Sequence, residues 1–137
     1  MKDLFALIVV ASFSMFATAA YAHSHHTANF CSTTAPDVCA HLGFENEPNS
    51  TDEAQFMLDL APSKANLSKI TDVGVALQMD MGGIPHGSSP VTIAPVDAAH
   101  YEVTKAYFVM TGTWQVKVTF VYNGIPGELL IPIEVVK

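Results

Sequence analysis

The residues best suited to chemistry are methionines and a histidine, gathered at residues 79–87. Met79 and Met81 are two residues apart, so on a strand their side chains point to the same face. The glycine pair that follows allows a sharp turn, which can return His86 over the two sulfurs. Two thioethers with an imidazole suit Cu(I), and a further imidazole would admit Cu(II). Met110, at the end of a later apolar run, could complete the thioether set.

Each of these residues also has an ordinary structural explanation. Met79 continues an apolar strand face, and methionine commonly fills irregular gaps in protein cores. His86 lies among Gly, Pro and Ser residues, where nothing forces burial and a histidine is often only a surface group. Asp80 points to the opposite face and is not expected to be a ligand. A metal site and simple packing therefore both remain open.

The N-terminus reads as a secretory signal over residues 1–22. Lys2 is followed by a largely apolar stretch, and Ala20-Tyr21-Ala22 is a small-x-small cleavage site. Cleavage after Ala22 predicts a periplasmic or secreted protein. An uncleaved signal is the alternative, and it is the only membrane contact that we expect.

Cleavage at this position would create a second candidate metal site. The new N-terminus would read His23-Ser24-His25-His26. Its amine, backbone amides and the His25 ring could chelate Cu(II), or its amine and the His23 ring could form two arms of a histidine brace. Otherwise these histidines belong to a flexible polar arm, as termini often do.

The cysteines, the net charge and the absence of enzyme motifs limit the possible partners and reactions. Cys31 and Cys39 are expected to form a disulfide after export, with copper-binding thiolates as the alternative. The formal net charge is −7 and no arginine is present, so a nucleic-acid partner is not expected. The sequence lacks G-x-S-x-G, H-E-x-x-H, P-loop and Cys-x-x-Cys motifs. We therefore do not expect an enzyme, with a histidine-brace copper oxidase as the alternative.

The elements that would position these residues are strands. Apolar and polar residues alternate through several runs, most clearly at 114–122 and 129–135. The pattern predicts an all-β, immunoglobulin-like or cupredoxin-like β-sandwich of about seven strands at 54–137. Residues 23–53 are expected to form a His-rich arm and the cysteine loop, with one helical turn at 37–44. Asn123-Gly124 predicts a hairpin turn, lengthened by residues 125–127.

A family resemblance supports this fold. Residues 79–91 and 101–135 resemble the YtkA-like/FixH-like family of small exported β-sandwich domains, through the Met-Asp-Met-Gly stretch, the following His-Gly-Ser-Ser-Pro-Val and the Gly-Thr-Trp strand. The resemblance implies an immunoglobulin-like sandwich and a link to copper handling or copper-oxidase assembly in the bacterial envelope. It also implies that Met79, Met81, His86 and Met110 lie near a metal. Here the loop carries a single histidine, fewer than in some relatives.

Together these features predict a periplasmic copper-binding protein that acts as a chaperone, a buffer or a factor in copper resistance or oxidase assembly. Its expected partners are the copper ion and a cuproprotein or a membrane copper transporter or oxidase. The alternative is an exported structural or protein-interaction domain that binds no metal.

Overall fold

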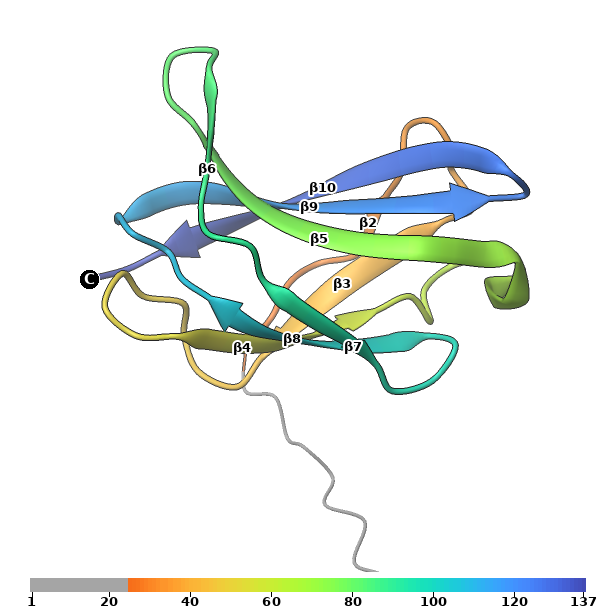
Figure 1. Ribbon diagram of the computed structural model, residues 1–137, viewed down its shortest axis with the longest axis horizontal. Coiled ribbons are helices and arrows are strands. Elements are labelled where there is room, and N and C mark those ends of the chain that lie inside the picture. Colours follow the sequence, from red (N-terminus) through yellow and green to blue (C-terminus); the bar gives the residue numbers. More distant parts are fainter. Residues whose placement is uncertain (1–24) are drawn as a thin grey trace, which may run out of the picture.

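Two antiparallel sheets pack face to face in the computed structural model, which describes residues 25–137 (Figure 1). The predicted all-β sandwich is confirmed. One sheet has the order β1 (His25–His26), β3 (Cys39–Phe44), β4 (Ala54–Asp59), β8 (His100–Ala106) and β7 (Thr92–Pro95), with β2 (Phe30–Cys31) also paired to β3. The other has the order β10 (Ile125–Val135), β9 (Gly112–Tyr122), β5 (Ile70–Asp80) and β6 (Pro85–Gly87).

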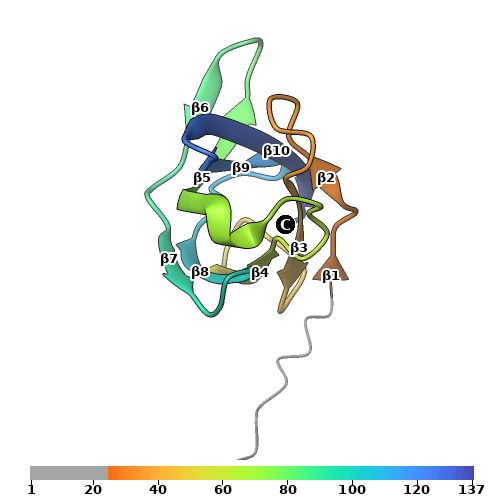
Figure 2. The ribbon, with the colours of Figure 1, turned by 90° about the vertical axis from the view of Figure 1, so that its right-hand side faces the viewer.

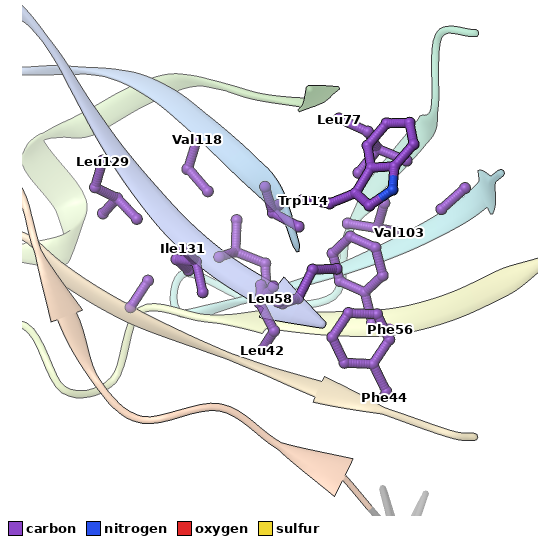
Figure 3. Close-up of a cluster of buried hydrophobic side chains, with 14 of the residues drawn as sticks. Leu42, Phe44, Phe56, Leu58, Leu77, Val103, Trp114, Val118, Leu129 and Ile131 are labelled. Atoms are coloured by element: carbon purple, nitrogen blue, oxygen red, sulfur yellow. The ribbon is translucent and has the colours of Figure 1, made fainter. Parts of the chain in front are cut away.

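The inner faces of the two sheets form the core (Figure 3). Along β9, Trp114, Val116, Val118 and Phe120 are buried and alternate with more exposed residues, as the sequence pattern predicted. Apolar side chains of β3, β4 and β8 close the core from the other side. A short 3-10 helix, η1 (Leu67–Lys69), leads into β5. No helix in this described part of the chain has the length and apolar character needed to cross a membrane.

The β9–β10 hairpin is tighter than predicted. Ile125 already pairs with Tyr122, so the loop contains only Asn123 and Gly124, both with positive φ. The prediction of a loop lengthened by residues 125–127 is therefore wrong. Pro126 is compatible with pairing because β10 is an edge strand. Gly127 leaves room for the ring of its partner Phe120, which would lie 2.6 Å from a Cβ at this position.

The segment before residue 54 also forms strands. The predicted helical turn at 37–44 is wrong, because β3 lies there between β1 and β4. Five of the six β3 residues are buried, so the strand shows no alternating pattern in the sequence. His25 and His26 pair with Phe44 and Gly43 across β1 and β3. The sandwich therefore includes strands on both sides of residue 54, and His25 and His26 do not lie in a free arm.

The expected disulfide is confirmed. Cys31 and Cys39 are direct partners across β2 and β3, and their sulfurs are bonded. Ser32, the next residue, is buried, and its hydroxyl donates a hydrogen bond to the Glu128 carbonyl of β10 at 2.7 Å. The disulfide and this hydrogen bond hold the β2 segment against the side of the sandwich formed by β3 and β10.

Replacing Cys31 and Cys39 by alanine should lower the free energy of unfolding by about 2.6 kcal/mol, because the unfolded chain gains the freedom that closing a loop of this length removes. Urea denaturation without reductant measures this difference, and the reduced wild type serves as the control. An unchanged unfolding midpoint in both would contradict the prediction.

Candidate functional site

The sharp turn predicted from the glycine pair is present between β5 and β6. Gly82 and Gly83 both have positive φ, at 71° and 86°. The Met81 N–H donates to the Ile84 carbonyl at 3.1 Å, and the Asp80 carboxylate accepts the Gly83 N–H at 2.7 Å. Asp80 therefore stabilises the turn.

The hairpin register places His86 directly opposite Met79. Direct partners in an antiparallel pair share a face, with Cβ atoms about 4.5–5.5 Å apart. Met81 lies on the same face, one alternation further from the sandwich. The predicted return of the imidazole toward the methionines is therefore confirmed for the backbone. Figure 1 shows this hairpin extending beyond the rest of the four-stranded sheet.

Exposure increases along this face as the hairpin leaves the core. Met79 is 9% exposed and belongs to the core cluster, whereas Met81 is 48% exposed and His86 is also exposed. One sulfur is therefore sheltered, and the other sulfur and the imidazole are open to solvent.

Met110 lies in the loop between β8 and β9, two residues before β9 begins. Its side chain is 41% exposed, and its carbonyl accepts the indole N–H of Trp114 at 2.9 Å. A Cβ at Gly112 would lie 3.4 Å from Cε of Met79, so the start of β9 contacts that methionine. We refer to Met79, Met81, His86 and Met110, the residues predicted to lie near a metal, as the hairpin site.

The start of the loop that carries Met110 is held by the carboxylate of Glu53, the residue directly before β4. Glu53 accepts the Lys105 backbone N–H at 2.7 Å and the Tyr107 hydroxyl at 3.0 Å. The hydrogen bond from Tyr107 to the carboxylate, and the negative charge beside it, raise the pKa of the Tyr107 phenol.

The N-terminal histidines lie on the other side of the sandwich. His25 and His26 line a hollow of about 270 Å³ together with Pro132, Ile133 and Glu134 of β10. β10 and β6 are the opposite edges of the four-stranded sheet, and Figure 2 shows β1 and β6 on opposite sides. The structure therefore does not bring these histidines to the hairpin site. The predicted signal segment 1–22 and His23 lie outside the described residues.

A second group of polar residues was not predicted. Strand register aligns His41, Asp59 and His100 on three neighbouring strands, with each imidazole Nε2 3.4 Å from an Asp59 oxygen. Asp97 binds the His100 Nδ1 at 2.8 Å, and its pKa is lowered by the Ala99 backbone N–H and then by His100. These residues are far apart in sequence, so only the register could have revealed the row.

The row formed by His41, Asp59 and His100 is not a complete metal site. Within residues 25–137, no three His, Cys, Asp or Glu side chains are placed to hold a metal ion together. A site built on thioethers, such as the hairpin site, does not depend on such a group.

Replacing Glu53 by glutamine should lower the Tyr107 pKa toward the ordinary tyrosine value, because the charge that opposes phenol ionisation is removed. NMR observation of the Tyr107 ring during an alkaline titration measures the change. Glu128→Gln, a substitution at an exposed glutamate that pairs with Lys117, is the matched control. Identical Tyr107 titrations in wild type and Glu53→Gln would refute the contact.

Comparison with known proteins identifies the family. No curated protein and no solved structure matches this chain. The family model described as YtkA-like matches residues 35–119, which is more than half of the sequence and extends from before β3 into β9. The chain belongs to the YtkA-like family.

Proposed function

We propose that this protein binds Cu(I) outside the cytoplasm, at the hairpin site, and acts as a copper chaperone, a buffer or a factor in copper resistance or oxidase assembly. The observation that carries the proposal is the pairing of Met79 with His86, with Met81 on the same face. This arrangement offers two thioethers and an imidazole to one ion.

The chemistry of these donors favours monovalent copper. Thioethers are soft ligands that select Cu(I), and imidazole binds copper in either oxidation state. Both cysteines of the chain are joined in the disulfide, so no thiolate competes with the methionines. The disulfide also favours an oxidising compartment, which agrees with the signal segment expected at residues 1–22.

The distribution of exposure supports a carrier that releases its ion. Met81, Met110 and His86 reach solvent, whereas Met79 is nearly enclosed. A partner could therefore replace the outer ligands one at a time while the inner sulfur still holds the ion. A cuproprotein or a membrane copper transporter or oxidase fits this role.

The second candidate is a structural or interaction domain that binds no metal. The observation that favours it is the position of Met79, which is buried in the core and packs against Gly112. A methionine in this position is useful for packing alone. The two candidates predict different results for a substitution that removes a methionine sulfur but keeps the side-chain volume. Copper affinity falls if the sulfur is a ligand, and there is no copper affinity to lose if the domain binds no metal.

Replacing Met81 by leucine should weaken Cu(I) binding by roughly tenfold or more, because loss of a ligand should cost at least as much as loss of a second-shell partner. Leucine keeps the side-chain volume. Competition with a chromophoric Cu(I) chelator measures the affinity.

The matched control is Met57→Leu. Met57 lies in β4 of the other sheet and pairs with Gly43 and Glu102, so its sulfur is not part of the hairpin site. Equal affinities for wild type and both variants would exclude the hairpin site. If the wild type does not bind Cu(I), the second candidate, a structural or interaction domain that binds no metal, is favoured instead.

Cu(I) binding should also change the fluorescence of Trp114, the only tryptophan of the chain. Its indole N–H is bonded to the Met110 carbonyl, and it follows Gly112 closely on β9, so an ion at this site lies near the ring. We expect saturable quenching that reaches its plateau at one equivalent. Chelator-detected binding with unchanged emission would place the copper elsewhere.

A further inference from the structure

We propose that Met81 is a site of reversible oxidation, where a peroxide converts the thioether to a sulfoxide and thereby weakens Cu(I) binding at the hairpin site. This inference rests on the proposed Cu(I) function, because it concerns how binding at that site is regulated. The observation that carries it is the difference in exposure between two methionines on one face of the hairpin. Met81 is 48% exposed, whereas Met79 is 9% exposed.

The turn beyond β5 leaves Met81 open to a small oxidant. A Cβ at Gly82 or at Gly83 would meet nothing within 4 Å, so no other segment covers the turn beside Met81. Met79 lies at the base of the same face, within the core cluster, and its Cε would lie 3.4 Å from a Cβ at Gly112. Because oxidation of sulfur follows its exposure, the outer methionine should react first.

No thiol of the protein competes for the oxidant. Both cysteines of the chain are joined in the disulfide, so methionine is the remaining sulfur group that a peroxide can oxidise. Residues 25–137 contain four methionines, and Met81 has the largest exposed fraction among them, followed by Met110 at 41%. Met57 is half-buried. Met81 is therefore the most accessible sulfur in the described part of the chain.

The reaction transfers one oxygen atom. The Met81 sulfur attacks hydrogen peroxide, an S–O bond forms as the O–O bond breaks, and the proton on the transferred oxygen passes to the departing hydroxide to give water. The sulfur is oxidised by two electrons and the peroxide is reduced by two. In the reverse reaction two thiols of a methionine sulfoxide reductase become a disulfide while the thioether and water form.

Oxidation should change the site and leave the fold intact. The sulfoxide is polar and no longer offers the soft thioether that selects Cu(I). The turn itself is held by the hydrogen bond from the Met81 N–H to the Ile84 carbonyl and by the Asp80 carboxylate, neither of which uses the Met81 sulfur. One of the two hairpin thioethers is therefore lost while the backbone that carries it stays in place.

The test begins with the metal-free protein, treated briefly with hydrogen peroxide and then freed of it. Peptide mass spectrometry should find sulfoxide at Met81 before it appears at Met79. Protein oxidised at Met81, with Met79 still intact, should bind Cu(I) about tenfold or more weakly in competition with a chromophoric chelator, as expected for the loss of a ligand. Treatment with reductases for both sulfoxide epimers should restore the affinity.

Three variants assign the effect to one sulfur. In Met81→Leu the same peroxide treatment should change the Cu(I) affinity less than about twofold, because the residue through which oxidation acts is already absent. Met110→Leu and Met57→Leu each remove another described methionine, and both should lose affinity on oxidation by the same factor as the wild type. Circular dichroism and thermal unfolding before and after peroxide treatment measure whether the fold is retained.

The outcomes separate this inference from the function on which it rests. Wild-type protein without Cu(I) affinity overturns both. Oxidation of Met79 as fast as Met81 overturns the inference alone. Unchanged affinity after oxidation of Met81, in a protein whose affinity does fall in Met81→Leu, also overturns it and leaves the hairpin site in place. An equal loss on oxidation of Met81→Leu overturns it as well, because the sensitive residue would then lie elsewhere.

Discussion

The alternation of side chains along β5 is the constraint on which the candidate site depends. Within the sandwich, alternate residues of this strand point inward, and Leu77 and Met79 are buried. The strand then continues beyond the sheet that covers it, so the same inward face becomes exposed at Met81. β5 and the residue that directly follows it therefore supply one sheltered and one accessible sulfur, and the hairpin register adds an imidazole without any further element.

The sheet order explains why the histidine-rich start of the chain does not complete this site. β1 and β2 associate with β3 at the edge of the sandwich that also contains β10, and the disulfide fixes β2 there. The hairpin projects from the opposite edge of the four-stranded sheet. The residue from outside the hairpin that contacts Met79 is Gly112 at the start of β9, because β9 lies beside β5.

Much of the fold could be predicted because strands covered on one face alternate visibly, as β9 and β10 do. The strand β3 could not be predicted, because five of its six residues are buried and the alternation with a period of two is lost. The return of His86 toward the methionines could be predicted from the spacing and the two glycines, whereas its exact partner, Met79, is given by the register. The hydrogen bonds of Glu53 could not be predicted from the sequence, because its partners Lys105 and Tyr107 lie more than fifty residues away and depend on sheet order.

If the hairpin site carries Cu(I), as we propose, it has to reconcile two opposing requirements. Tight binding favours ligands that are already in place, because ordering them on binding costs free energy. Release to a partner favours ligands that solvent and other side chains can reach. The structure separates these demands by residue: Met79 is fixed by packing, the Met110 backbone by the Trp114 N–H, and the turn by Asp80, whereas the Met81 and His86 side chains remain open. Rigid backbones with exposed donor atoms would allow the proposed site both to hold an ion and to pass it on.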